Sequence, residues 1–337
     1  MRGIFPFDRR LRVVFNPGSH GRCDLRSEDS KLDVSVVGEL NLDLILYGLP
    51  EELEPERELL ADRLALTLGS SSGIFAHNLA RLGSRVGFIA RIGDDPLGRI
   101  SIERLSQGGV DVSRVRTASG ATTTGLTVIL THARYRHILT YPGTMFEMCF
   151  EDLDLDYLAS ARHFHLSSFF LHRALQPRIP ELFRTMKERG LTTSLDTNDD
   201  PEDRWEGGLR ETLRHVDIFF PNAREARKIA GCEDMAGAVA RLAELVPLVV
   251  VKLGEEGALA RRGVEEVTSP CVPVEFVDPV GAGDSFDAGF LHQYVRGADL
   301  ATCLAWGNRA GAFSTTRPGG TEAFRDQARC KSFFNLP

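Results

Sequence analysis

The stretch Val277-Asp278-Pro279-Val280-Gly281-Ala282-Gly283-Asp284-Ser285-Phe286 carries the most information about the fold of this chain. An apolar run at 272–277 precedes the turn and predicts a short strand. The segment 285–295 is apolar on nearly every side, which is typical of a buried helix. Glycines leave backbone N–H groups uncovered, and at the positive end of a helix those groups attract a phosphate. We therefore interpret Gly281, Ala282 and Gly283, together with Asp284, as an anion-binding turn that carries a carboxylate.

The same stretch also has a purely structural interpretation. Glycine-rich turns often start helices, and Asp is a common residue of the first turn. A carboxylate beside an anion site nevertheless suits a reaction in which a hydroxyl group loses a proton while a phosphoryl group arrives. The remainder of the chain has to distinguish the two interpretations.

The composition restricts the classes of function. The chain has 337 residues, 42% of them hydrophobic and 26% charged, which indicates a globular protein with one large α/β domain or two smaller ones. The formal net charge is −7 and no basic stripe occurs, so nucleic acid is not an expected partner. No apolar run reaches the length of about 18 residues that a membrane span requires. Six scattered cysteines without paired spacing favour a reducing, cytoplasmic location.

Residues 1–32 are basic and irregular, and we expect them to form a poorly ordered arm outside the fold. From residue 161 onward, strand-like and helix-like segments alternate. Strands are predicted at 164–167, 192–195, 217–220, 248–251 and 272–277, and helices near 174–189, 206–214, 223–230, 235–245, 282–296 and 299–315. The apolar runs at 218–220 and 248–251 are typical of parallel strands covered on both faces. Right-handed crossovers would then build one open, mostly parallel sheet in a three-layer α/β/α arrangement.

The first half of the chain adds further elements. Strands are predicted at 34–38, 64–68 and 85–92, and helices at 74–82 and 97–107. Two alternating segments, 122–131 and 135–141, are rich in β-branched residues and predict a hairpin that belongs to a small accessory sheet. Arg134 and Arg136 on this hairpin are either solvated strand charges or substrate contacts.

Polar and small residues recur where the predicted strands end. They lie at Asn41 and Asp43, Gly69 to Ser71, Asp196 and Asn198, Asn222 and Glu225, Lys252 and Gly254, and Gly281 to Asp284. Ligands of open α/β sheets bind beyond the carboxyl ends of the strands, so this recurrence predicts one shared site. Asn41 and Asp43 would lie on one face of an extended segment and could bind sugar hydroxyls, or they belong to a surface turn.

Two further motifs have a structural and a functional interpretation. Asn222 followed by Glu225 is a helix capping box, and Glu225 could also hold Mg²⁺ through water. Lys252 to Gly257 is either a hairpin turn or a surface for nucleotide phosphates and ribose. Neither a Gly-x-Ser-x-Gly elbow nor a Walker sequence is present, so we do not expect a P-loop ATPase.

Together these residues resemble the ribokinase-like (PfkB) carbohydrate kinases. The run Asp278 to Asp284 is similar to the C-terminal signature of that family, with Pro279 in place of the usual Thr. The segments 38–43 and 82–98 resemble its first substrate strand and its N-terminal signature region. Asn222-x-x-Glu225 resembles its magnesium motif, and Lys252 to Gly257 its nucleotide loop. The resemblance covers about residues 33–325, which leaves 326–337 as a C-terminal tail.

One departure from the family pattern concerns the sugar site. The family's Gly-Gly pair falls on Gly69 and Ser70, and the Asn that follows it, a sugar contact, falls on Ile74. Asp196-Thr197-Asn198, followed by Trp205, is similar to the fructokinase and 2-keto-3-deoxygluconate kinase branch.

The resemblance implies a ribokinase-like fold whose lid strands come from about 40–70 and 115–145. It also implies an ATP-dependent kinase for a primary hydroxyl of a fructose-, ribose- or 2-keto-3-deoxygluconate-like substrate, with Asp284 as the general base and an anion hole at Gly281 to Asp284. The implied substrate contacts are Asn41, Asp43, Gly69, Ser70, Ser71, Arg136 and Asn198. The implied nucleotide contacts are Asn222, Lys252, Gly254, Gly257, Gly283 and Asn308. Glu225 would hold Mg²⁺ through water, and a monovalent cation, K⁺, would bind at Asp278, Val280, Ser314, Arg317 and Gly319.

The resemblance further implies a lid that excludes water and that pairs with a second copy in a homodimer. Two alternatives stay open. A nucleoside (adenosine-like) kinase of the same fold could stack a base on Ile74 and on the phenylalanines of 164–170. A non-catalytic sugar-sensing protein could also use this scaffold.

Overall fold

A computed structural model describes residues 32–336, and residues 31–337 group into one compact unit. The arm expected at residues 1–32 lies outside the described residues, apart from Leu32, which begins the first strand.

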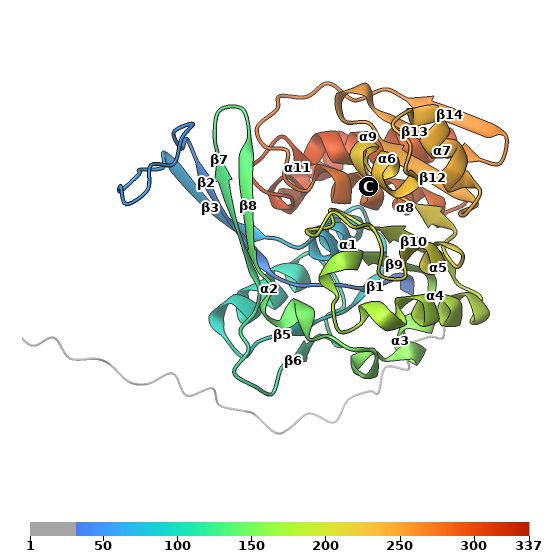
Figure 1. Ribbon diagram of the computed structural model, residues 1–337, viewed down its shortest axis with the longest axis horizontal. Coiled ribbons are helices and arrows are strands. Elements are labelled where there is room, and N and C mark those ends of the chain that lie inside the picture. The colour runs from blue at the N-terminus through green and yellow to red at the C-terminus, as the bar shows by residue number, and fades with distance from the viewer. Residues whose placement is uncertain (1–31, 337) are drawn as a thin grey trace, which may run out of the picture. The chain divides into compact units, whose positions relative to one another are not determined.

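An eight-stranded sheet forms the centre of the described part of the chain (Figure 1). Its strands, in spatial order, are β14 (Glu265–Ser269), β13 (Ala258–Arg262), β12 (Leu248–Lys252), β11 (Ile218–Phe219), β10 (Thr192–Asp196), β9 (Ala161–Ser167), β1 (Leu32–Val37) and β4 (Val86–Ile89). The strands from β12 to β4 run parallel to their neighbours, whereas β13 and β14 are antiparallel. The predicted open, mostly parallel sheet is confirmed, and the β13–β14 hairpin at its edge is an addition to the prediction.

Helices cover both faces of this sheet (Figure 1). On one face lie α1 (Ser71–Arg81), α2 (Pro96–Gln107), α8 (Ala282–Tyr294) and α9 (Leu300–Ser314). On the other lie α3 (Leu155–Ala159), α4 (Ile179–Glu188), α5 (Leu209–Leu213), α6 (Ala223–Ala230) and α7 (Met235–Ala243). Successive strand residues point to opposite faces, so Val250 packs in one core and Val251 in the other. The three-layer prediction is therefore confirmed.

The strand predicted at 272–277 is wrong. These residues form no strand; the only backbone bond recorded there joins the amide of Val277 to the carbonyl of Thr315. Pro273 lies in the middle of the run and has no N–H group to donate to a neighbouring strand. Phe276 is also 63% exposed, so the run does not enter the core. An irregular segment therefore leads into α8.

Several predicted boundaries also shift. Helix α1 begins at Ser71 rather than at 74, because the side chain of Ser70 caps it by accepting from the amide of Gly73. The strand predicted at 85–92 is divided into β4 and β5 (Arg91–Ile92), and β5 pairs with β6 (Arg116–Thr117) outside the main sheet.

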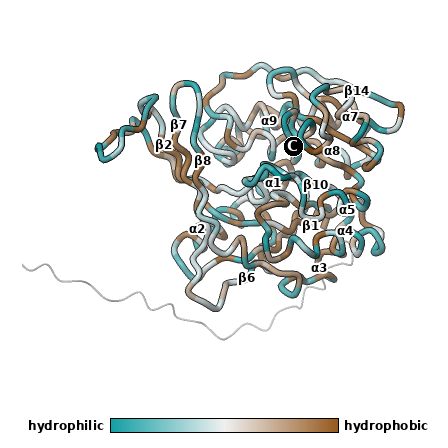
Figure 2. Tube along the Cα trace, in the orientation of Figure 1, coloured by the Kyte–Doolittle hydropathy of each residue, from teal (hydrophilic) through white to brown (hydrophobic). Residues whose placement is uncertain are grey.

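A second sheet of four strands forms the small sheet that was predicted as a lid (Figures 1 and 2). Its order is β3 (Arg63–Leu68), β2 (Leu42–Tyr47), β7 (Leu126–Thr131) and β8 (Arg136–Tyr141). We call it the lid sheet. The pairing places Asp43 beside Thr127 and Thr127 beside Thr140, on one face. Leu44, Val128 and Leu139 are aligned in the same way on the other face.

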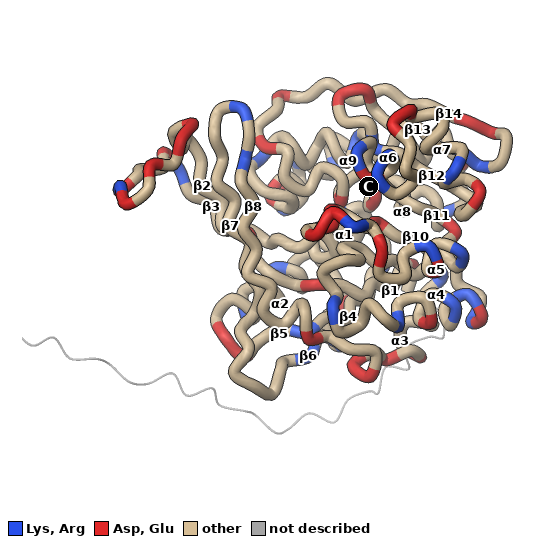
Figure 3. Tube along the Cα trace, viewed as in Figure 1, with Lys and Arg blue, Asp and Glu red and all other residues tan. Residues whose placement is uncertain are grey.

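Within the predicted C-terminal tail, the described residues 326–336 contain helix α11 (Gln327–Phe334), which follows the short α10 (Glu322–Arg325). Cys330 and Phe334 of α11 are buried, and the ring of Phe334 stacks on that of Trp306 from α9. Along the described chain, Lys and Arg residues are interspersed with Asp and Glu residues, without a basic stripe in this view (Figure 3). No helix between residues 32 and 336 combines the length and the apolar character needed to cross a bilayer.

Candidate active site

The first turn of α8 leaves most of its amide groups available. Gly281 caps the helix with a φ of 72°, and a Cβ there would lie 2.6 Å from the Cα of Gly320, so only glycine fits. Within residues 32–336, the amides of Gly281, Gly283 and Asp284 donate to no other group, whereas that of Ala282 makes a long bond of 3.3 Å to the carbonyl of Pro279. Three of the four predicted amides can therefore receive an anion.

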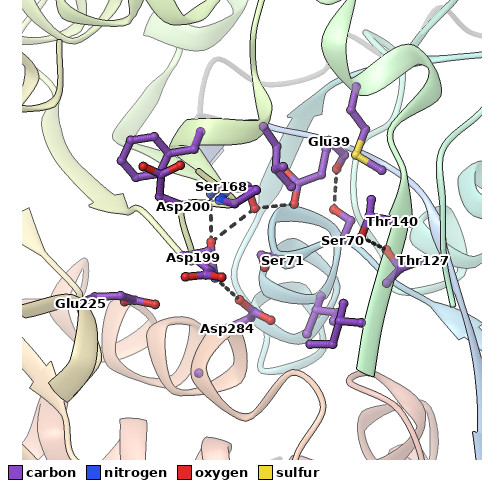
Figure 4. Close-up of a pocket in the computed structure, with 18 of the residues that line it drawn as sticks. Glu39, Ser70, Ser71, Thr127, Thr140, Ser168, Asp199, Asp200, Glu225 and Asp284 are labelled. Carbon is purple, nitrogen blue, oxygen red and sulfur yellow. Dashed lines mark hydrogen bonds between the residues drawn. The ribbon is translucent and has the colours of Figure 1, made fainter. Parts of the chain in front are cut away.

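Asp284 projects from this turn into a cavity (Figure 4). The side chain is buried, and the amide of Asn198 approaches its Oδ1 at 3.4 Å. Burial raises the pKa of Asp284 to about 6; the carboxylates of Asp196 and Glu39 contribute, and the ammonium of Lys252 opposes them. The carboxylate is thus ionised at neutral pH yet accepts a proton more readily than an exposed Asp.

The cavity has a volume of about 1200 Å³ and brings together most of the predicted site. The predicted residues that line it are Asn41, Asp43, Ser70, Ser71, Arg136, Asn198, Asn222, Glu225, Lys252, Gly254, Val280, Gly281, Ala282, Gly283 and Asp284. The predicted residues that do not line it are Gly69, Gly257, Asp278, Asn308, Ser314, Arg317 and Gly319. As the sequence predicts, residues that follow different strands meet at one edge of the sheet.

Asp43 marks the end of the cavity under the lid sheet. It is 5% exposed, and its carboxylate has no hydrogen-bond partner among residues 32–336. Burial raises its pKa to about 7, with further contributions from the carboxylates of Asp284 and Asp278. Gly69 supports this arrangement, because a Cβ there would lie 2.1 Å from the Asp43 carboxylate. An unpartnered, buried acceptor that faces a cavity suits a ligand rich in hydroxyl groups.

Glu39 and Ser168 are site residues that the sequence analysis missed. The carboxylate of Glu39 accepts from the hydroxyls of Ser72 (2.7 Å) and Ser168 (2.8 Å). The amide of Ser168 donates to Oδ1 of Asn198, whose Nδ2 in turn approaches Asp284 (Figure 4). A continuous chain of polar contacts therefore joins Glu39 to Asp284. Because Ser168 directly follows β9, the strand-end rule that found Asn198 could also have found it.

Glu225 has the contacts of the predicted capping box. Its Oε2 accepts from the backbone amide of Asn222 at 2.8 Å, and its Oε1 from the side-chain amide of Asn222. Burial raises its pKa to about 7, Asp196 adds to this, and Lys252 opposes it. Each carboxylate oxygen keeps a further lone pair that can accept from a water molecule, so this side chain also fits a water-mediated contact with Mg²⁺. The two interpretations are compatible.

The predicted nucleotide loop is only partly at the cavity. Lys252 is not on an open surface; its side chain is 12% exposed and bonds to Asp196 and Asp287. Gly254 lines the cavity and Gly257 does not. The side-chain amide of Asn308 donates to the carbonyls of Ser269 (2.9 Å) and Pro270 (3.1 Å), so it fixes the end of β14.

The segment proposed for a monovalent cation is internally bonded. Oδ1 of Asp278 accepts from the amide of Val280, and Oδ2 accepts from the amide of Gly319 and the hydroxyl of Tyr47. The hydroxyl of Ser314 donates to the carbonyl of Gly311, and Arg317 borders a smaller hollow of about 410 Å³. No group of three or more His, Cys, Asp or Glu in the described part of the chain could hold a metal ion by itself.

An open α/β sheet, a carboxylate at the start of a helix and free amides beside it are the parts that phosphoryl transfer requires. The pfkB family of carbohydrate kinases matches residues 31–327. A sugar kinase of unassigned substrate from Archaeoglobus fulgidus is 32% identical over 250 residues, 72% of this chain and 96% of the relative. A nucleoside kinase from Methanothermobacter thermautotrophicus is 30% identical over 290 residues, 85% of this chain and 90% of the relative. The structure of adenosine kinase from Sinorhizobium meliloti has a TM-score of 0.78 at 26% identity and covers 89% of this chain and 99% of its own.

The chain belongs to the pfkB carbohydrate kinase family. It is an ATP-dependent phosphotransferase for a sugar or a nucleoside, and kinases of this family use ATP with Mg²⁺. The resemblance inferred from the sequence is thereby confirmed.

Proposed function

We propose that this kinase transfers the γ-phosphoryl group of ATP to a primary hydroxyl of a sugar or sugar acid, with Asp284 as the general base. The observation that carries the proposal is the first turn of α8, where a buried carboxylate and three unpartnered amides face one cavity. The supporting observation is Asp43, the unpartnered acceptor at the lid end of the same cavity.

In this mechanism Asp284 accepts the proton of the attacking hydroxyl, because its raised pKa favours proton uptake near neutral pH. The amides of Gly281, Gly283 and Asp284 donate to the phosphoryl group as its charge redistributes. Mg²⁺, when bound, neutralises phosphate charge, and Glu225 would hold it through water. Asn222 orients the carboxylate of Glu225 for that contact.

The proposed acceptor contacts come from four parts of the chain. Asn41, Asp43, Ser70, Ser71, Arg136 and Asn198 line the cavity, and Thr127 and Thr140 add two hydroxyls from the lid sheet. The hydroxyl, amide and carboxylate groups among these contacts favour a substrate with many hydroxyl groups. The lid sheet supplies one wall of the cavity, and its position suits exclusion of water during transfer.

A nucleoside is the second candidate substrate. Ile74, Ile138, Met145, Phe146 and Phe170 form apolar lining, and a base could pack against it. Of the aromatic residues expected to stack a base, Phe164 and Phe169 are fully buried in the core, whereas Phe170 reaches the cavity. The membership of the chain in a family of kinases counts against a non-catalytic sugar sensor.

A substrate panel tests the proposal. D-fructose, D-ribose, 2-keto-3-deoxygluconate, adenosine and cytidine would each be incubated with ATP and Mg²⁺, and ADP release measured. Turnover of a sugar or sugar acid with kcat/KM above that of both nucleosides supports the proposal. Turnover of nucleosides alone establishes the second candidate instead.

We further propose a homodimer that pairs through the lid sheet. The lid face opposite the cavity carries an apolar series of side chains: Leu44, Leu46, Leu64, Leu66, Val128, Leu130 and Leu139. Leu64 and Leu139 are 60% and 55% exposed, and an apolar face of this kind is typical of an interaction surface.

We also propose that K⁺ activates the enzyme through the segment around Asp278, and that the protein is cytoplasmic. Free thiols are compatible with a reducing compartment, and they are found at Cys149, Cys232, Cys271, Cys303 and Cys330.

A further inference from the structure

The side chain of Lys252 joins three elements directly beneath the predicted anion hole. Its Nζ donates to Oδ2 of Asp196 at 2.6 Å, from β10, and to Oδ2 of Asp287 at 3.2 Å, from α8. A Cβ on Gly283 would lie 3.5 Å from the same Nζ, so the ammonium lies against the first turn of α8. One buried cation therefore fixes the start of the helix that carries Asp284 relative to two parallel strands.

The ammonium of Lys252 interacts with all three of the carboxylates of Asp284, Asp287 and Glu225, and the guanidinium of Arg224 interacts with Glu225 as well. The groups that face Lys252 are the carboxylates of Asp196 at the end of β10, of Glu225 on α6 and of Asp284 and Asp287 on α8, and the buried imidazole of His165 on β9. Asp284 is also faced by Glu39 after β1 and by Asp43 on β2. Burial opposes the charge on Lys252, but the carboxylates of Asp196, Asp287 and Glu225 outweigh it and raise its pKa. The ammonium therefore stays protonated throughout the physiological pH range.

We infer that Lys252 is a positioning residue for phosphoryl transfer: it fixes the first turn of α8, and its positive charge keeps the Asp284 carboxylate able to accept the substrate proton. The inference rests on the proposed role of Asp284 as the base. Two of the three N–H groups of the ammonium are already used by Asp196 and Asp287, so a surface for the nucleotide is not its main role. Without Lys252, the like charges around Asp284 would no longer be compensated, and the burial that already raises the pKa of Asp284 would be opposed only by the hydrogen bond with Ser71.

The test compares Lys252→Met, Lys252→Arg and Asp196→Asn, with Lys228→Met as the matched control. Lys228 is a half-exposed lysine that pairs with Asp203 outside the cavity, so its loss removes the same charge elsewhere. For each protein, kcat/KM for the best acceptor of the panel above is measured from pH 5 to 9 at low MgATP, so that it reports the free enzyme. The dissociation constant of ATP is measured by calorimetry.

Lys252→Met should shift the acidic limb of the kcat/KM profile to higher pH by about one unit, as expected for loss of a nearby opposite charge. Because the pKa of Asp284 is about 6, that shift should lower kcat/KM about fivefold at pH 6 and about twofold at pH 7. At pH 9 the shift should leave kcat/KM unchanged. A lower plateau of kcat/KM at pH 9 would measure the loss of activity that comes from displacement of the first turn of α8 rather than from the pKa of Asp284. Lys252→Arg should restore the limb, Asp196→Asn should move it to lower pH because the carboxylate of Asp196 raises the pKa of Asp284, and Lys228→Met should leave it unchanged.

The inference would be overturned if the acidic limb is the same in Lys252→Met and in the unsubstituted protein. It would also be overturned if Lys252→Met weakens ATP binding tenfold or more, because Lys252 would then be assigned to the nucleotide. If Lys252→Met does not fold, as judged by circular dichroism, the opposite shift expected of Asp196→Asn decides. If Asp284 is not the base, the Asp284→Asn variant will keep its activity, whatever the Lys252 variants show. That outcome distinguishes a wrong assignment of the base from a wrong role for Lys252.

Discussion

Replacing Asp284 with Asn should abolish most of the activity and also stabilise the fold. Loss of a general base typically lowers the rate by about 10²–10⁴, which corresponds to about 3–5 kcal/mol of transition-state stabilisation. Asn keeps the shape of the side chain, so the cavity and the acceptor contacts stay in place. Binding of the acceptor, measured by calorimetry, should therefore change little while kcat falls.

The stability gain follows from the pKa of Asp284. Its value in the folded protein is about 6, against an ordinary value of 3.8, so the folded state binds the proton more tightly than the unfolded state. Ionisation of this buried group therefore destabilises the fold as the pH rises from about 4 to about 6. At 1.36 kcal/mol for each pH unit, the full effect at pH 7 is up to about 3 kcal/mol. Asn carries no charge, so the Asp284→Asn variant should recover part of this free energy of unfolding.

The assay is urea unfolding of both proteins at pH 7 and at pH 4.5, beside ADP release at saturating ATP. The variant should unfold at higher urea than the unsubstituted protein at pH 7, and the difference should shrink at pH 4.5. Asp203→Asn is the control, because Asp203 is exposed and its pKa is lowered by Lys228 and Trp205 rather than raised. A fully active Asp284→Asn enzyme would refute the assignment, and a variant that is inactive because it unfolds would refute the energetic argument.

Three further predictions concern the ions and the assembly. Glu225→Gln should raise the Mg²⁺ concentration needed for half-maximal rate, because the amide attracts metal-bound water more weakly than the carboxylate; an unchanged Mg²⁺ titration would leave only the helix cap. Rates in potassium buffer should exceed those in sodium buffer, and equal rates would count against a cation near Asp278. Leu139→Glu should convert a dimer to a monomer in size-exclusion chromatography while the cavity face of β8 is unaltered; a protein that is already monomeric before the substitution would contradict the proposed pairing.

Short-range patterns predicted much of the site. The glycine turn before Asp284 and the Asn222–Glu225 capping box involve residues a few positions apart, so spacing alone reveals them. The strand-end rule then brought distant residues such as Asp43 and Asn198 to one cavity without any knowledge of their contacts.

Long-range contacts were beyond the same reasoning. Lys252 is separated by 56 residues from Asp196 and by 35 from Asp287, and no local pattern indicates that the three side chains meet. The false strand at 272–277 had a simpler cause, since apolar character was given more weight than the missing N–H of Pro273. The bonds from the side-chain amide of Asn308 to backbone carbonyls were hidden for the same reason, since a motif position does not reveal them.

The alternation of side chains in the lid sheet places the acceptor contacts on one face of the sheet and the proposed self-association surface on the other. Along β7, Thr127 and Ile129 face the cavity, whereas Val128 and Leu130 face the opposite side, and β8 continues both series. Point substitutions at every second position can therefore retune acceptor preference without altering self-association, and the reverse holds for the intervening positions. Insertion of a single residue within β7 would exchange the two sets and disrupt both properties together.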